Sequence, residues 1–487
     1  MRVLFVAHDL GFIAPIGVQY LSAVAKTLGW ETRLAVIASQ HVLDVINQWE
    51  PDMVAYSSCT GEHKYYHQFN KVVSELHPEI WTIMGGPHPT FFPDALGHDS
   101  LDAVCVGEGE GAFGDFLLAV ENGSVIHDIP NLRTKDGYSP PRPLVRDLDT
   151  LPVPDVSIFY GPPDSWTTMG GNNLKSFITG RGCPYNCSYC FNHAWKKLYS
   201  GKGKLVRRHS VDYILDLLKY VKKNYPLAVV KFYDDVFAFS LDDWLVAFGD
   251  RYPIEIGLPF YILTRADLLT EDIIKVLKEA GCTTISMSIE HGRESIRNDQ
   301  LRRNMSDQQI LDAFALCKKY GIMTFSNTIV GLPDATIADD VYSVKFNIKA
   351  GADYAEFPVF HPYPGTDLGN SVIERGLYDG DFNAIPKFYM GRSPLNSFSE
   401  QEKDVHSNIA LLGMIAVVIP RAWPAIRRLI RVRHTHWVNK LYTVVYQIIK
   451  TFMIRRIYPT NTPWREFLPI LWESFRQEFL KHEVTDG

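Results

Sequence analysis

The stretch Gly180-Arg181-Gly182-Cys183-Pro184-Tyr185-Asn186-Cys187-Ser188-Tyr189-Cys190-Phe191 holds three of the seven cysteines of this 487-residue chain, spaced C-x3-C-x2-C. It follows a predicted strand, so the three thiols lie on one loop and can converge on one metal centre. Thiolates are soft ligands that suit iron–sulfur clusters or zinc. Three ligands with no fourth cysteine at metal-site spacing leave one coordination position open, which is typical of a catalytic site. A zinc site completed by His193 is the alternative.

Strands and helices alternate along residues 171–375, around and after this loop. Six units are too few for a closed eight-fold barrel, so we predict a partial (β/α)6 barrel. Its strand candidates are Lys175–Thr179, Val229–Tyr233, Phe260–Leu263, Thr284–Ile289, Met323–Ile329 and Tyr354–Phe360.

Residues 1–125 show a second α/β alternation, which predicts a flavodoxin-like, doubly wound parallel sheet. Its strand candidates are Val3–Ala7, Arg33–Ile37, Met53–Ser57, Trp81–Gly85 and Ala103–Val106. Ligands of such sheets lie outside the carboxyl ends of the strands. Three loops rich in small residues are expected there: Ser57-Ser58-Cys59-Thr60, Gly85-Gly86-Pro87-His88-Pro89 and Gly107-Glu108-Gly109-Glu110-Gly111.

Two further regions complete the expected organisation. Residues 126–170 are rich in proline and predict a linker, because proline breaks helices and favours extended chain. Residues 376–487 predict a helical C-terminal domain. Within it, Val405–Arg465 holds ten basic residues and no acidic one, interleaved with apolar residues. Such a region suits an anionic membrane surface or an anionic substrate, or else forms a cap packed on the barrel with its basic face in solvent.

The charge, the cysteine count and the apolar runs of the chain exclude several classes of protein. The formal net charge of -6 argues against nucleic-acid binding. An odd number of cysteines and the lack of a secretory signal do not suggest a disulfide framework. No apolar run reaches the roughly 20 residues that span a bilayer. We therefore expect a cytoplasmic protein in a reducing setting, with peripheral contact to the inner face of the membrane as a further hypothesis.

The cysteine loop and its barrel resemble the radical S-adenosylmethionine (SAM) superfamily. That resemblance implies that Cys183, Cys187 and Cys190 hold a [4Fe–4S] cluster, whose fourth iron binds SAM. It implies that reduction of the cluster, by an external donor such as flavodoxin or ferredoxin, cleaves SAM to a 5′-deoxyadenosyl radical. No catalytic side chain is assigned beyond the cluster.

Four further segments match the family's SAM site. Tyr189 matches the aromatic residue beside the adenine, and Glu290 matches the residue that hydrogen-bonds the ribose. Asp234 or Asp235 matches the acceptor of the SAM amino group, although the segment departs from the commoner Gly-Gly-Glu form and Asp is also a good cap in its own right. Arg265 is expected to pair with the SAM carboxylate or to form a structural salt bridge.

The first domain resembles the cobalamin-binding domain of B12-dependent radical SAM proteins. The resemblance implies a corrin whose tail is buried along the sheet, close to Ser57, Ser58, Gly85, Gly86, Pro87, Gly107, Glu108 and Gly109. The Asp-x-His-x-x-Gly motif of other B12 enzymes is absent, so no protein histidine is expected on cobalt.

The resemblance implies methylation of an unactivated carbon of a small molecule or lipid, through the radical and methylcobalamin. A ring-forming oxidation or ring rearrangement, of the type of the anaerobic magnesium-protoporphyrin monomethyl ester cyclase, is the alternative. A non-catalytic cobalamin sensor is a remote alternative.

Overall fold

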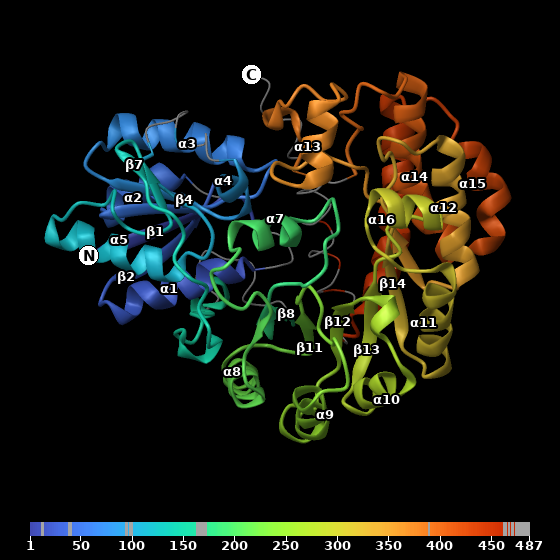
Figure 1. Ribbon diagram of the computed structural model, residues 1–487, viewed down its shortest axis with the longest axis horizontal. Helices are drawn as coiled ribbons and strands as arrows, with labels where there is room; N and C mark the ends of the chain where they lie inside the picture. The colour runs from blue at the N-terminus through green and yellow to red at the C-terminus, as the bar shows by residue number, and fades with distance from the viewer. Residues whose placement is uncertain are drawn as a thin grey trace.

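The computed structural model describes residues 1–10, 14–37, 41–92, 96, 101–161, 173–387 and 390–460, together with residues 465, 468 and 472. The chain forms three consecutive parts, an N-terminal sheet with its helices, a barrel, and a layer of C-terminal helices on the far side of the barrel (Figure 1). The end of the predicted linker (162–170), the first two residues of the predicted barrel (171–172) and most of residues 461–487 lie outside the described residues.

The N-terminal sheet has the strand order β2-β1-β3-β4-β5-β6-β7. Its first five strands are parallel, as predicted, and follow the order of flavodoxin-like folds. They are β1 (Arg2–Ala7), β2 (Glu31–Val36), β3 (Met53–Ser57), β4 (Trp81–Gly85) and β5 (Ala103–Cys105).

Both faces of this sheet are buried, because successive side chains of a strand point to opposite sides. In β1, Val3 and Phe5 join the apolar layer shared with α1 and α5, whereas Leu4 and Val6 join the layer shared with α2 and α3. The bounds of the helices are α1 Ile16–Thr27, α2 Val42–Trp49, α3 His63–Leu76, α4 Pro87–Phe91 and α5 Glu110–Asn122.

The proline-rich segment contributes structure beyond a linker. Its strands β6 (Leu132–Thr134) and β7 (Gly137–Tyr138) pair antiparallel with β5 and with each other, and so extend the N-terminal sheet. The prediction of a proline-rich linker did not include these strands, because both are too short to show a period-2 pattern. A short helix, α6 (Ser157–Tyr160), follows.

The second sheet is the predicted six-stranded, open barrel. All of its strands are parallel, in the order β15-β14-β13-β12-β11-β8. They are β8 (Leu174–Phe177), β11 (Val229–Phe232), β12 (Phe260–Thr264), β13 (Cys282–Met287), β14 (Met323–Asn327) and β15 (Tyr354–Glu356). The intervening helices are α8 (Val211–Asn224), α9 (Asp243–Glu255), α10 (Glu271–Glu279), α11 (Asp307–Lys319) and α12 (Ile337–Ala350).

Each of these five helices begins at a residue whose side chain accepts a hydrogen bond from the first turn, which satisfies an otherwise unpaired N–H group. The capping residues are Ser210, Asp242, Thr270, Ser306 and Thr336. Strands β9 (Gly180–Arg181) and β10 (Arg207–Arg208) pair antiparallel outside the barrel sheet, and the cysteines follow β9.

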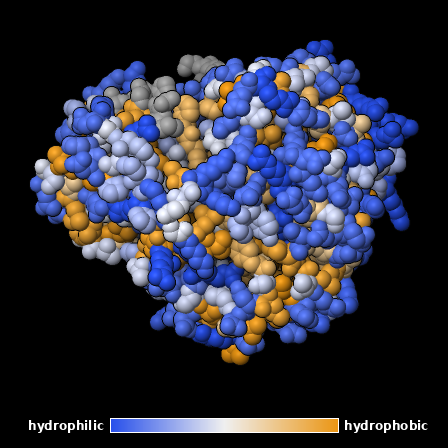
Figure 2. Space-filling view, viewed as in Figure 1, coloured by the Kyte–Doolittle hydropathy of each residue, from blue (hydrophilic) through white to orange (hydrophobic). Residues whose placement is uncertain are grey.

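Helix α13 (Asp367–Glu374) lies at the end of the range predicted as the barrel. The C-terminal part that follows is helical, as predicted, and contains α14 (Glu400–Val418), α15 (Trp423–Leu429) and α16 (His436–Ile457). Helix α14 is buried along residues 404–417 and packs against α12, β15 and α16. No helix within the described residues is both long and apolar enough to cross a membrane. On the face shown in Figure 2, apolar side chains gather in a band through the middle of the view, where the N-terminal part meets the barrel.

Candidate active site

The cysteine loop runs from the end of β8 to the start of α7 (Phe191–Leu198), at the carboxyl end of the barrel strands. Cys187 is buried, and Cys183 and Cys190 are half-buried. Ser188 anchors the loop to the segment after β13: its hydroxyl donates a hydrogen bond to the carbonyl of Gln300 (2.6 Å), and its N–H donates one to the carbonyl of Leu301 (3.2 Å).

The thiols of Cys183 and Cys190 lie close to Cys187 and to the carboxylate of Asp235. The pKa of Cys183 is raised to about 11 and that of Cys190 to about 12, mainly by burial and in part by the charges of Asp235 and Cys187. A metal cluster replaces these protons, because thiolates and not thiols are its ligands. The donor set therefore fits a three-cysteine cluster.

Two arginines approach the sulfur of Cys187. The Nη1 atom of Arg265 lies 4.0 Å from it and that of Arg303 lies 3.9 Å from it. Arg265 uses its other nitrogens on Asp267 (2.9 and 3.0 Å) and stacks over Tyr185. The geometry thus contains the structural salt bridge that was one of the two predictions for Arg265. Arg303, which the sequence reasoning missed, is buried and supplies a second cation beside the thiols.

The two adjacent aspartates after β11 have different surroundings. Asp234 is buried and accepts hydrogen bonds from both the N–H and the hydroxyl of Thr179 and from the N–H of Gly180 (2.8–3.1 Å). Burial raises its pKa to about 6 in spite of these donors. Asp235 instead faces the thiols and hydrogen-bonds Asn192 and the backbone of Gly182. Asp234 therefore shapes the start of the loop, and Asp235 lies next to the cluster position.

Glu290 and Tyr189 flank the same space. Glu290 is buried at the end of β13, with a left-handed backbone (φ 64°) that non-glycine residues rarely adopt. Its carboxylate lies 3.9 Å from Arg303. Tyr189 is surrounded by the charges of Arg303, Glu290, Cys187 and Cys190, and burial raises its pKa well above the usual value. The structure thus brings all the residues predicted to bind the cluster and SAM to one end of the barrel, and their individual roles stay predictions.

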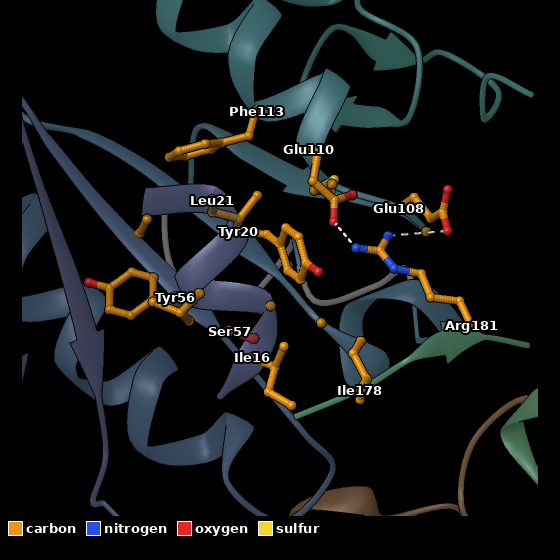
Figure 3. Close-up of a pocket in the computed structure, with 18 of the residues that line it drawn as sticks. Ile16, Tyr20, Leu21, Tyr56, Ser57, Glu108, Glu110, Phe113, Ile178 and Arg181 are labelled. Carbon is orange, nitrogen blue, oxygen red and sulfur yellow. Dashed lines mark hydrogen bonds and ion pairs between the residues drawn. The ribbon is translucent and has the colours of Figure 1, made fainter. Parts of the chain in front are cut away.

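A cavity of about 320 Å³ lies at the carboxyl ends of the N-terminal strands (Figure 3). It is mainly apolar, with Phe5, Ile16, Leu21, Tyr56 and Phe113 among its walls. Of the predicted cobalamin-binding residues, Ser57, Gly85, Gly86, Gly107, Glu108 and Gly109 line it. Ser58 and Pro87 do not: Ser58 is buried behind Gly86, and Pro87 begins α4.

The same cavity extends to the barrel. Ile178, Arg181 and Gly182, which lead to Cys183, are among its lining residues, as are Asn192 and Trp195 after Cys190. These residues could not be predicted as cavity walls from the sequence, since they belong to the other domain. A ligand in this cavity therefore reaches from the N-terminal sheet to the cysteine loop.

Buried ion pairs hold the two parts together beside the cavity. Arg181 pairs with Glu110 (2.5 Å) and Glu108 (3.3 Å), and Arg207 pairs with Glu108 (2.6 Å). Burial alone would raise the pKa of Glu110, but the charge of Arg181 holds it below its usual value. Figure 3 shows Arg181 between the two glutamates, with Tyr20 alongside. The Gly-Glu-Gly-Glu loop thus holds β9, the strand that leads to the first cysteine, through Arg181.

Inside the barrel lies a lysine that the sequence reasoning missed. The Nζ atom of Lys231 is 4.5 Å from the ring centre of Tyr233 and 5.0 Å from those of Tyr261 and Tyr458. Burial lowers its pKa to about 7, although the charge of Glu356 opposes this shift. Alternation along β11 places Lys231 and Tyr233 on the interior side of the barrel, whereas Phe232 packs under the outer helices.

Two family models match the chain, the B12 binding domain over residues 2–117 and the radical SAM superfamily over residues 177–346. The chain belongs to the B12-binding radical SAM enzymes. This result confirms the family, the fold class and the cofactors expected from the sequence, which are a [4Fe–4S] cluster, SAM and cobalamin. It also argues against the two alternatives, a zinc site in the cysteine loop and a non-catalytic cobalamin sensor.

Relatives of this B12-binding radical SAM enzyme include methyltransferases and a cyclase. An uncharacterized methyltransferase of Pyrococcus horikoshii is 28% identical, over 74% of this chain and 79% of its own length. The anaerobic magnesium-protoporphyrin IX monomethyl ester cyclase of Rubrivivax gelatinosus is 24% identical, over 76% and 69%. Among solved structures, the radical SAM methyltransferase TsrM of Kitasatospora setae, with cobalamin and a [4Fe–4S] cluster bound, has the same fold (TM-score 0.66, 16% identity, 86% of this chain and 89% of that chain).

The residues described above fit both cofactors. The three thiols and the arginines beside Cys187 suit an anionic cluster. The apolar cavity has the size and position of a ligand pocket at the carboxyl edge of a doubly wound sheet. A Cβ atom on Gly86 would lie 2.6 Å from the carbonyl oxygen of Ser58, and one on Gly107 would lie 2.0 Å from the hydroxyl of Tyr199. The glycines therefore let these loops fold tightly beside the cavity.

Proposed function

We propose that this enzyme transfers a methyl group to an unactivated carbon of a small molecule or lipid. The observation that carries the proposal is a cavity whose walls come both from the loops predicted to bind cobalamin and from Gly182 of the cysteine loop and Asn192 of α7. When bound, SAM on the cluster supplies a 5′-deoxyadenosyl radical, and cobalamin supplies the methyl group. The protein's own part is to hold the two cofactors near one another and to exclude water from the space between them.

The side chains around the loop have proposed roles that follow from their positions. Cys183, Cys187 and Cys190 hold the cluster. Asp235, which faces the thiols, accepts a hydrogen bond from the amino group of SAM. Asp234 instead fixes the start of the loop, because it accepts hydrogen bonds from Thr179 and Gly180.

Glu290 accepts hydrogen bonds from the ribose, and Tyr189 packs beside the adenine. Arg303 offsets the negative charge of the thiolates, because its Nη1 atom is 3.9 Å from Cys187. Arg265 shares this task. A direct contact of Arg265 with the SAM carboxylate would require its guanidinium to be shared with Asp267.

On the cobalamin side, Ser57, Gly85, Gly86, Gly107, Glu108 and Gly109 contact the cofactor, and Ser58 and Pro87 support them from behind. Glu108 also binds Arg207 and Arg181, so its carboxylate is committed to the domain interface. Its contact with cobalamin is therefore expected through the backbone.

Ring-forming oxidation is the second candidate. It is favoured by the similarity to a cyclase, which spans three quarters of this chain. Both candidates need an electron from outside, and we propose an external one-electron donor such as flavodoxin or ferredoxin.

The test is anaerobic incubation of the reconstituted full chain with candidate substrates and methyl-labelled SAM, followed by mass spectrometry. A gain of one labelled methyl group supports transfer, and a loss of hydrogens without label supports cyclisation. Cys187→Ala is expected to abolish formation of 5′-deoxyadenosine, whereas Cys317→Ala, a buried cysteine outside the loop, should retain it. Full activity of Cys187→Ala would refute the assignment of the cluster.

A further inference from the structure

Helix α12 carries three buried polar side chains in one row. Asp340, Ser343 and Asn347 are each 0% exposed. Their spacing of three and four residues places them one above another on the same face of the helix. Buried polar side chains are almost always hydrogen-bonded, so the partners of this row show what it holds in place. We call these three residues the polar stripe.

The partners of the polar stripe lie just after β13 and β14, at the carboxyl end of the barrel strands. Three hydrogen bonds connect the stripe to them: from the N–H of Gly292 to the hydroxyl of Ser343 (2.8 Å), from the N–H of Gly331 to the carboxylate of Asp340 (3.2 Å), and from the side-chain amide of Asn347 to the hydroxyl of Thr328 (2.9 Å). Successive turns of α12 thus fix both segments.

Glu290 lies between these anchors. Its N–H donates to the carbonyl of Asn327 (3.0 Å), and its own carbonyl accepts from the N–H of Ile329 (2.7 Å). The left-handed backbone of Glu290 is unfavourable for a residue with a side chain, and such a conformation persists only where its surroundings enforce it. Gly292 contributes to this, since a Cβ atom there would lie 2.6 Å from the Cα of Ser343. Helix α12 and β14 therefore hold Glu290 from both sides.

Asp340 also links this turn to the C-terminal helices. Its carboxylate lies 3.8 Å from Nε2 of His291 and 3.1 Å from Nε2 of His406 on α14. Nδ1 of His291 accepts a hydrogen bond from the N–H of Arg293 (3.1 Å), which leaves Nε2, the nitrogen that faces Asp340, as the donor. Burial alone would raise the pKa of Asp340, but the two imidazoles hold it below its usual value. An ionised Asp340 thus attracts the residue that follows Glu290.

We propose that the three residues of the polar stripe are positioning residues for SAM, which hold the carboxylate of Glu290 where the ribose binds. The inference rests on the role proposed for Glu290 above. Because the stripe is fully buried, it acts on SAM only through the segments that it holds. The cysteine loop is anchored elsewhere, on Gln300 and Leu301, so the cluster should assemble without the stripe.

The test is equilibrium dialysis of labelled SAM against the reconstituted full chain with its cluster oxidised, which measures affinity without turnover. Glu290→Gln should weaken binding by about tenfold or more, because hydrogen bonds to a charged group are lost. Ser343→Ala should weaken it by about 3- to 10-fold, because the N–H of Gly292 loses its acceptor.

The chain offers a matched control in Ser407 of α14. The hydroxyls of Ser343 and Ser407 both donate to the carbonyl four residues earlier, at 3.1 Å. Within the described residues, only that of Ser343 also accepts from the end of a barrel strand. Ser407→Ala should therefore bind SAM as the unmodified chain does.

A second matched pair compares the two ends of β14. Thr328→Val removes the hydroxyl that binds Asn347 at the carboxyl end, and Thr324→Val removes the hydroxyl that binds Asp353 (3.0 Å) at the amino end. Both threonines are buried, so both variants should lower the midpoint of urea denaturation. Only Thr328→Val should weaken SAM binding, and equal weakening by the two would overturn the proposal.

The double variant Ser343→Ala/Glu290→Gln separates positioning from a general loss of structure. If the stripe acts through Glu290, the double variant should bind SAM no more weakly than Glu290→Gln alone, because the two residues share one interaction. Losses that multiply, or a loss of bound iron from Ser343→Ala, would overturn the proposal.

Failure of the stripe can be told apart from failure of the role proposed for Glu290. Weakened binding in Glu290→Gln with unchanged binding in Ser343→Ala overturns the stripe alone. Unchanged binding in Glu290→Gln overturns the role of Glu290 and the inference with it. Methyl transfer enters none of these measurements, so they stand whichever reaction the enzyme carries out.

Discussion

Replacing Glu108 by Gln should separate the role of the domain interface from that of the cofactor loops. The carboxylate of Glu108 accepts hydrogen bonds from Arg207 (2.6 and 3.1 Å) and Arg181 (3.3 Å) and from the N–H of Val145 (3.3 Å). The side chain of Arg207 is only 2% exposed. A glutamine of the same shape keeps part of this hydrogen bonding but leaves a buried guanidinium without its counter-charge.

The expected loss of stability in Glu108→Gln follows from the burial of Arg207. Removing one partner of a buried ion pair costs about 3–5 kcal/mol, because the remaining charge stays desolvated. The chain offers a matched control in Asp115, which pairs with Arg142 at 2.8 Å but is 50% exposed. Exposed pairs contribute about 0–1 kcal/mol, so Asp115→Asn should change stability little.

Urea denaturation of the cofactor-free protein, followed by circular dichroism, is the assay. With a slope of about 3 kcal/mol per molar urea, Glu108→Gln should lower the midpoint by about 1 M or more, and Asp115→Asn by less than about 0.3 M. Iron content after reconstitution should fall with Glu108→Gln, since Arg181 precedes Cys183 by two residues. Equal, small shifts for the two variants would refute the idea that this interface depends on buried charge.

Three further outcomes can be checked. Burial raises the pKa of Asp234 to about 6, so this carboxyl binds a proton more tightly in the folded than in the unfolded state. In urea titrations, the stability of the unmodified chain relative to Asp234→Asn should therefore fall as the pH rises from about 4 to 6. A stability difference that does not change with pH would contradict the raised pKa. Gly107→Ala should destabilise by about 1–3 kcal/mol because its φ is +90° and its Cβ would meet Tyr199, whereas Gly137→Ala, which meets nothing within 4 Å, should not. Arg303→Met should make the midpoint potential of the cluster more negative, measured by electron paramagnetic resonance during a redox titration, and an unchanged potential would remove its proposed electrostatic role.

The parallel strands of both sheets could be placed from the sequence to within a few residues, because buried parallel strands are short apolar runs bounded by turns, whereas the short antiparallel strands β6 and β7 could not. The cysteine loop could be placed for the same reason, since its position is fixed by the strand before it. The choice between Asp234 and Asp235 could not be made, because adjacent residues at a strand end point in opposite directions and only the three-dimensional turn shows which one faces the thiols.

Arg303 and Lys231 were out of reach for another reason. Arg303 lies 116 positions from Cys187 along the chain, and two of the three rings around Lys231 belong to the distant residues Tyr261 and Tyr458, so no local pattern marks either basic residue. The barrel-side walls of the cavity, such as Ile178 and Trp195, were missed likewise, because packing between domains leaves no periodicity in either one.

The left-handed backbone of Glu290 has a consequence for engineering. Glycine adopts this conformation freely, so the backbone alone would fold more easily with glycine at position 290 by about 1 kcal/mol. A search for stabilised variants that scores only the backbone conformational energy would choose Glu290→Gly and would remove the carboxylate beside Arg303. At position 290 a gain in thermal stability is therefore expected to reduce turnover, so thermostabilised libraries of this enzyme should keep Glu290.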